Sequence, residues 1–349
     1  MGQPPTHAIA ESYLAEWVEG LLREGEVIGP RVAHGSDVAY DVVTSPEEVA
    51  WDYTTSLTPL KQFLFPQVDP LLRWEREEAG ELRVDPTVDE TERIFLAVRP
   101  CDVSGVNFLD RVFSRDRQDA YYLSRRQRST FIALACNQPG ENCFCVCAHS
   151  GPFLDAGYDL QLTRLSGECL VEVGSQRGAD LVGRSNGMFA PAPQTLVRAR
   201  EEAARAAEER FGDHKAYFAA VLRTVTFDRV PEAVWEEMAE RCLECGGCSF
   251  VCPTCSCFLT ADRQWGTSGE RDRIWDSCLY ECHAREASGH NPRAARKDRL
   301  KARFFHKLSH QFAKPLETHG CVGCGRCVTA CLGANDMPSV TAKIRRGAL

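Results

Sequence analysis

The sequence lacks several features that define common protein classes. No apolar run approaches the roughly eighteen residues of a membrane-spanning helix, and no G-x-G-x-x-G fingerprint of a dinucleotide site follows a strand pattern. The first residues lack the basic start and apolar core of a signal peptide. With a net charge of −8, the chain has no basic excess for general nucleic-acid binding. We therefore expect a cytoplasmic protein that neither spans a membrane nor binds nucleic acid.

Cysteine is also absent from the first hundred residues, but eighteen cysteines follow. Cytoplasmic thiol buffers keep such residues reduced, which favours metal ligation over disulfides. Five lie between Cys101 and Cys147, Cys169 stands alone, and twelve follow residue 240. A chain of 349 residues is long enough for two domains. We predict a mixed α/β domain over residues 1–230 and an α-helical ferredoxin-type dicluster domain over residues 231–349.

Hydrophobic patterning predicts the elements of the first domain. Apolar spacing indicates helices over residues 12–25 and 104–113, and a helix start at residues 45–49. Short apolar runs over residues 93–98 and 129–136 indicate buried strands. The charged stretch 195–210 is typical of a solvated helix.

Two cysteine runs in the second domain have ferredoxin spacing. "CLECGGCSFVCP" reproduces C-x-x-C-x-x-C-x-x-x-C-P, and "CVGCGRCVTAC" repeats it with Leu332 in place of the proline. In two-cluster ferredoxins, the fourth cysteine of each run ligates the other cluster. The predicted ligands of one [4Fe-4S] cluster are Cys242, Cys245, Cys248 and Cys331. Those of the other are Cys252, Cys321, Cys324 and Cys327.

Two other interpretations of these runs are weaker. A zinc ribbon needs only two C-x-x-C pairs and would leave several thiols without a role. The C-x-x-x-C-x-x-C spacing of radical S-adenosylmethionine enzymes also occurs at Cys248, Cys252 and Cys255. That match lies inside the longer run and lacks a barrel-like alternation of strands and helices around it.

A long insert, residues 253–320, separates the two runs. Its segment 296–312 has apolar residues at helical spacing, so we expect a helical version of the ferredoxin module. Its basic stretch, residues 285–307, fits a solvated helix, a docking surface or compensation of negative cluster charge. Four further cysteines could bind another metal, although we favour buried thiols without a metal: Cys255, Cys257, Cys278 and Cys282.

The first domain contains a third set of cysteines. Cys101 and Cys136 each follow a predicted strand, and would meet at one end of the sheet if those strands are parallel neighbours. Cys143 and Cys145 follow on a loop that could fold over that end. These four would suit a third [4Fe-4S] cluster, but the irregular spacing is equally typical of scattered core thiols.

Several segments together resemble a known family. "RPCDVSGVNFLD", "ENCFC", "WDSC", "GHN", "KDR" and "CVGCGRC" are similar to the beta subunit of cytosolic nickel-iron hydrogenases, also called sulfhydrogenases, and to the related iron-sulfur subunit of anaerobic sulfite reductase. The resemblance covers most of the chain from about residue 90 onward. It implies that Cys101, Cys136, Cys143 and Cys145 ligate the additional cluster, with Cys147 or Asp102 as a substitute for one ligand.

The resemblance also implies a function and partners. It indicates an iron-sulfur electron-transfer subunit that relays electrons from or to a flavoprotein NAD(P)H-binding subunit, with the small and large subunits of a nickel-iron hydrogenase at the other end. The alternative context supplies a sirohaem sulfite reductase subunit in place of the hydrogenase. A free-standing flavin reductase and a binding protein with structural clusters are the two rival classes. No catalytic residue is predicted in this chain.

Overall fold

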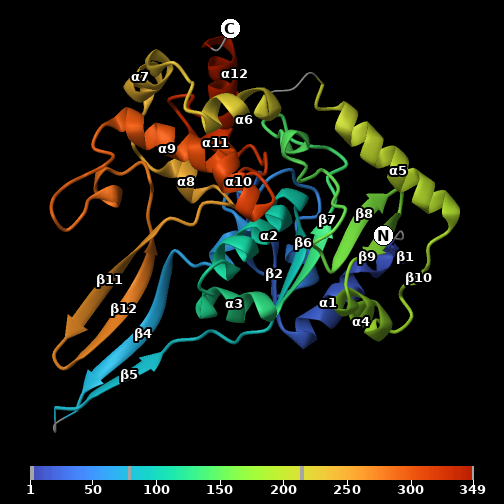
Figure 1. Cartoon of the computed structure of the whole chain (residues 1–349). Coiled ribbons are helices and arrows are strands. Elements are labelled where there is room, and N and C mark those ends of the chain that lie inside the picture. Colours follow the sequence, from blue (N-terminus) through green and yellow to red (C-terminus); the bar gives the residue numbers. More distant parts are fainter. Residues whose placement is uncertain (1–3, 78–79, 213–215, 348–349) are drawn as a thin grey trace.

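The computed structural model describes residues 4–77, 80–212 and 216–347, and its larger sheet has eight strands (Figure 1). The strands are β1 (Thr6–Ala10), β2 (Glu26–His34), β3 (Asp37–Val42), β6 (Arg93–Val98), β7 (Ser129–Leu134), β8 (Leu160–Leu165), β9 (Glu168–Val173) and β10 (Ala190–Pro191). Their order is β10-β1-β9-β8-β7-β6-β2-β3. The pairs β2–β6, β6–β7 and β7–β8 are parallel, and the others are antiparallel.

Helices cover both faces of this sheet. They are α1 (Leu14–Glu24), α2 (Pro100–Ser114), α3 (Ala120–Gln127), α4 (Gln176–Arg184) and α5 (Gln194–Glu209). Helices α1 and α4 bury Trp17 and Leu181 in the core on one face. On the other face, α2 and α3 bury Phe108 and Tyr122 in a second core. The first domain is therefore a three-layer α/β arrangement, because apolar strands of a central sheet must be covered on both faces.

A smaller, four-stranded sheet extends away from these layers (Figure 1). It contains β4 (Val68–Arg76), β5 (Leu82–Pro86), β11 (Phe258–Trp265) and β12 (Ser268–Trp275), in the order β11-β12-β4-β5. At its base, the buried Asp69 carboxylate accepts hydrogen bonds from Arg125 and Arg273, both at 2.6 Å. Since β4 pairs with β12, this sheet joins segments on either side of the predicted boundary at residue 230.

Helices dominate the C-terminal part. They are α6 (Phe218–Thr226), α7 (Glu232–Arg241), α8 (Gly247–Phe250), α9 (Arg296–Leu308), α10 (His310–Leu316), α11 (Arg326–Ala330) and α12 (Met337–Gly347). Val221, Trp235, Phe304 and Val340 share one core, so α6 packs with the C-terminal helices although it precedes residue 230. Among the described residues, no helix has both the length and the apolar character needed to cross a membrane.

The predicted fold class, an α/β domain followed by a ferredoxin-type dicluster domain, is confirmed. Residues 93–98 are β6, and the run from residue 129 is β7. The predicted helices at 12–25, 104–113 and 195–210 correspond to α1, α2 and α5. The expected helix at residues 45–49 is wrong in type, because Pro46–Glu48 forms only a 3₁₀ turn, which ends where Val49 turns extended. The remaining 3₁₀ turns are Glu11–Tyr13, Leu60–Phe63, Cys145–Ala148 and Glu281–Ala284.

The insert between the two cysteine runs differs from the helical expectation in two ways. It contains the β11–β12 hairpin, and the helix expected over residues 296–312 is divided at Ser309. Ser309 is extended, with ψ 136°, and its hydroxyl accepts a hydrogen bond from the Gln311 amide at the start of α10. A capping serine thus ends one helix and begins the next.

Candidate metal centres

The first predicted ligand set, here the first group, surrounds the end of α7 and the short α8. Its members are Cys242, Cys245, Cys248 and Cys331. Cys242 ends α7, Cys248 lies in α8, and Cys331 ends α11. Burial raises the pKa of Cys242, and its neighbours Cys248 and Cys331 raise it further against a lowering backbone hydrogen bond. The structure therefore places the fourth cysteine of the second run near the thiols of the first run.

The glycine before α8 permits the tight loop of the first group. Gly246 has φ 71°, a left-handed conformation that side chains other than glycine rarely adopt. A Cβ atom there would also lie 2.6 Å from the Tyr280 hydroxyl oxygen. Cys245 precedes this glycine and is exposed, so the first group lies at the protein surface.

The second predicted set, the second group, is enclosed. Its members are Cys252, Cys321, Cys324 and Cys327, and all four line one cavity. Burial raises the pKa of Cys324 to about 12 and that of Cys327 to about 11, and in each case Cys252 contributes to the increase. The fourth cysteine of the first run therefore lies beside the thiols of the second run.

The third group is Cys101, Cys136, Cys143 and Cys145. Strands β6 and β7 are parallel neighbours, so Cys101 at the start of α2 and Cys136 just after β7 meet at one end of the sheet, as expected. Burial raises the pKa of Cys136, and neighbouring Cys143 raises it further against the lowering effect of Arg99. Cys145 lies in the 3₁₀ turn that follows Cys143, and both Cys136 and Cys143 raise its pKa after burial. The loop therefore does fold over that end of the sheet.

The two substitute ligands named for the third group have other contacts. The buried Asp102 carboxylate accepts hydrogen bonds from Arg326 at 2.7 Å and from the Tyr40 hydroxyl at 3.0 Å. The Leu60 amide donates a third, longer one at 3.4 Å. Cys147 packs against the apolar core of the C-terminal helices. Asp102 therefore has a full set of protein partners.

The second and third groups abut across the two parts of the chain. The Phe144 amide donates a hydrogen bond of 2.8 Å to the Gly323 carbonyl. A Cβ atom on Gly323 would lie 2.5 Å from the Phe144 carbonyl oxygen and 2.6 Å from the Cys145 amide nitrogen. The thiol of Cys143 lies 3.9 Å from the Cys324 carbonyl oxygen. The backbone at Gly323 therefore contacts the backbone of Phe144 and Cys145 directly, and a residue with a side chain would not fit at this position.

Buried cations surround these thiols. Lys307 donates hydrogen bonds to Cys252 Sγ at 3.2 Å and to Thr254 Oγ1 at 2.6 Å. Arg303 and Arg326 are each less than 5% exposed, and Arg303 Nε and Arg326 Nη1 have no hydrogen-bond partner among the described residues. A buried charge without compensation is strongly destabilising. Asp102 compensates the charge of Arg326, whereas Arg303 has no carboxylate partner among the described residues. Anionic iron-sulfur clusters bound by the thiolates would compensate the charge of Arg303, so the residues present fit such clusters.

A single metal ion does not fit these groups. Around one zinc ion, with Zn–S of about 2.3 Å, the sulfurs must lie within about 4 Å of one another. Within the described ranges, no three His, Cys, Asp or Glu side chains form a site for one metal ion. In a [4Fe-4S] cluster each thiolate binds its own iron, so its sulfurs stand farther apart. The geometry therefore disfavours the zinc-ribbon interpretation.

The buried cations were not identified individually from the sequence, although compensation of cluster charge was one interpretation of the basic stretch. Arg299, Arg303 and Lys307 recur at four-residue spacing on α9 and are all buried. Leu300, Phe304 and Leu308 occupy the adjacent buried positions of the same helix. The sequence signal that could have revealed these buried cations is the four-residue repeat of basic residues beside an apolar stripe of the same helix.

Comparisons with known proteins agree with this geometry. Two family profiles, each described as "4Fe-4S dicluster domain", match residues 241–334 and 207–255. The "Sulfhydrogenase 2 subunit beta" of Pyrococcus furiosus is 31% identical over 337 residues, which cover 96% of this chain and 97% of that protein. No solved structure matches the chain.

Proposed function

The chain belongs to the family of sulfhydrogenase beta subunits, and on that premise we propose that it relays single electrons between two partner subunits through [4Fe-4S] clusters held by the first, second and third groups. It is an iron-sulfur electron-transfer subunit of a sulfhydrogenase-type complex. A bound [4Fe-4S] cluster supplies reversible one-electron oxidation and reduction. The chain supplies the ligands, their spacing and the surrounding charge.

The serial contact of the three groups is the observation that carries this proposal. Cys331 lies near Cys242 of the first run, and Cys252 lies near Cys327 of the second run, which supports an interleaved arrangement of the first and second groups. The Phe144–Gly323 hydrogen bond holds the third group against the second. A protein with purely structural clusters has no need for three groups in contact from one part of the chain to the other.

The residues around the groups would tune their reduction potentials. Lys307 donates to Cys252 Sγ, and the Asn335 amide donates to Cys331 Sγ at 3.2 Å. Hydrogen bonds to sulfur and nearby positive charge favour the reduced state of a cluster. Cys321 and Cys324 of the second group are buried, and Cys252 and Cys327 are half-buried, so the protein keeps water from much of this group.

The surface near the first group fits a docking site for one partner. Cys245 is exposed, and two apolar side chains of the same loops are also exposed, Leu243 by 66% and Leu332 by 88%. We propose as partners a flavoprotein NAD(P)H-binding subunit, together with the small and large nickel-iron hydrogenase subunits. The name of the Pyrococcus furiosus relative favours this context over sulfite reductase. A cytoplasmic location remains a prediction from the sequence patterns of the chain.

Anaerobic purification of the intact complex tests this function. We expect iron and acid-labile sulfide in equal amounts in this chain, and nickel in a co-purifying subunit. Reduction of the clusters by NAD(P)H should require the flavoprotein subunit. Sirohaem absorbance in a co-purifying subunit, in place of nickel, would indicate that the partner is a sulfite reductase subunit. A chain purified without iron would refute the proposed electron relay.

A further inference from the structure

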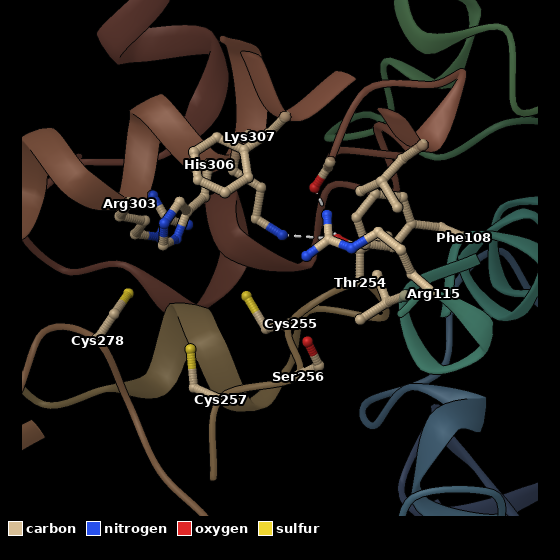
Figure 2. Close-up of a pocket in the computed structure, with 14 residues that line it drawn as sticks. Phe108, Arg115, Thr254, Cys255, Ser256, Cys257, Cys278, Arg303, His306 and Lys307 are labelled. Atoms are coloured by element: carbon tan, nitrogen blue, oxygen red, sulfur yellow. Dashed lines mark hydrogen bonds between the residues drawn. The ribbon is translucent and has the colours of Figure 1, made fainter. Parts of the chain in front are cut away.

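Three cysteines outside the three groups line one further cavity. It has a volume of about 220 Å³ and lies between α9 and the segments on either side of the β11–β12 hairpin. Cys255, Cys257 and Cys278 form one side, and Figure 2 shows Arg303, His306 and Lys307 of α9 on the opposite side. We call this space the α9 cavity. Cys282, the fourth of the unassigned C-terminal cysteines, is exposed and does not line it.

The charge around the α9 cavity favours an anionic occupant. Arg303 and Lys307 are 2% and 5% exposed, and neither forms an ion pair with a carboxylate in the described part of the chain. Arg303 Nε, buried at this wall, has no hydrogen-bond partner among the described residues. No Asp or Glu lines the cavity. A buried guanidinium without a counter-charge is costly, so an anion is expected here.

The same two cations also line the cavity of the second group. Arg303 and Lys307 therefore stand between two sets of thiols, with the second group on one side and the α9 cavity on the other. If an anionic cluster in the second group pairs with one of these two cations, the other cation remains available to an anion in the α9 cavity. Lys307 donates a hydrogen bond to Cys252 of the second group, whereas in the described part of the chain Arg303 donates one hydrogen bond, of 3.4 Å, to the Asn335 carbonyl oxygen.

The three thiols resemble the predicted cluster groups more than a single-ion site. Like those groups, they do not form a site for one metal ion among the described residues. Three thiolates leave one iron of a cubane without a cysteine ligand. Among the described residues that line the cavity, His306 is the only histidine and none is a carboxylate. His283 contacts Cys257 but lies outside this lining. Its ring packs edge-on against Phe312 at 4.4 Å, and neither ring nitrogen has a hydrogen bond within the described ranges.

We propose that Cys255, Cys257 and Cys278 hold a fourth [4Fe-4S] cluster, with His306 as the ligand of its remaining iron. Loading takes two ferrous ions, two ferric ions and four sulfide ions, which together make the [4Fe-4S]²⁺ core without a net redox change, and each thiol releases one proton as its sulfur bonds to iron. The site deepens the proposed function, because it adds a one-electron centre beside the second group. The inference rests on that function only in requiring that the chain is loaded with iron-sulfur clusters.

Iron counting on the anaerobically purified full chain tests the inference. The first three groups account for about twelve irons, and the fourth cluster raises the expected total to about sixteen. The double variant Cys257→Ser/Cys278→Ser should lose about four irons and four sulfides while the signals of the other clusters persist. Cys282→Ser is the matched control, because Cys282 lies four residues after Cys278 in the sequence but is outside the cavity. It should keep the wild-type iron content.

Further outcomes separate the inference from the proposed function. His306→Ala should keep the cluster but change its paramagnetic resonance spectrum, which a merely structural role of His306 would leave unchanged. If the double variant fails to fold, the iron content of the wild-type chain decides between three and four clusters. Variants of the third group must first show that this group holds four irons. A total of about twelve irons, zinc bound in the α9 cavity, or full iron content in the double variant would overturn the fourth cluster and leave the relay intact. A chain without iron would refute both.

Discussion

Arg326 donates a hydrogen bond of 2.7 Å to the carboxylate of Asp102, and both side chains are buried. Asp102 follows Cys101 of the third group, and Arg326 precedes Cys327 of the second group. This ion pair therefore joins two groups that lie far apart in the sequence. It fixes the relative position of the two parts of the chain at the point where their thiols meet.

Removing one partner of that pair should be strongly destabilising. Asp102→Asn leaves Arg326 as a buried cation without its counter-charge, which costs about 3–5 kcal/mol. The measurement is the midpoint of anaerobic denaturation, followed by cluster absorbance. Asp262→Asn removes a partner of the exposed Arg271 pair, and it should shift that midpoint little because water screens the pair. Equal effects of the two substitutions would contradict the assigned role of Asp102.

Lys307 should raise the reduction potential of the second group. Lys307→Met removes a positive charge and a hydrogen bond to the Cys252 sulfur. A hydrogen bond to a charged group contributes about 1.5–3 kcal/mol, so the potential should fall by on the order of 100 mV. Lys301→Met is the control on the same helix, because Lys301 pairs with Asp228 at the surface. The check is a redox titration, and an unchanged potential in Lys307→Met would refute this role.

Gly323 should be intolerant of any side chain. It has φ +60°, and a Cβ atom would collide with the backbone of Phe144 and Cys145. Left-handed strain and overpacking together predict a loss of about 2–5 kcal/mol for Gly323→Ala, with loss of iron from both adjoining groups. Gly35→Ala has nearly the same φ, +56°, and no atom within 4 Å of the added Cβ. It should cost only about 1–2 kcal/mol and keep all iron. Similar iron contents in the two variants would contradict the close backbone contact.

The third group should hold one cluster through Cys143 and Cys145. The double variant Cys143→Ser/Cys145→Ser should lose about four irons, as measured by iron and sulfide analysis of the full chain. Cys147→Ser should lose none, because Cys147 packs into the apolar core of the C-terminal helices. Loss of iron in Cys147→Ser would instead make Cys147 a ligand.

The sequence predicted the parts of the site that local spacing determines. The two ferredoxin runs, the placement of Cys331 near the first run and of Cys252 near the second, and the strands before Cys101 and Cys136 all follow from short patterns. The β11–β12 hairpin was missed because its inner partner is β4, about two hundred residues earlier, and because β11 is mostly exposed and has no clear alternation of apolar and polar residues. The β12–β4 pairing is non-local, so no window of sequence reveals it, whereas the two-residue turn at Gly266 and Thr267 between β11 and β12 is a local signal.

The cations inside the C-terminal part were missed for a different reason. Arg and Lys are mostly exposed in proteins, so the stretch 285–307 was expected mainly to be a solvated helix. In the structure, Arg303 and Lys307 are buried at the wall between the second group and the α9 cavity. Their burial is favourable only if the neighbouring thiols carry negative charge. That charge depends on a bound cofactor, which is not part of the amino-acid sequence.

The most direct test of the relay is a potentiometric titration of the anaerobically purified full chain, followed by paramagnetic resonance. The account predicts that the clusters of the first, second and third groups accept electrons at accessible potentials, and that their reduced signals broaden one another because the groups are in contact. Zinc in place of iron, or clusters that remain silent under strong reductant, would contradict it.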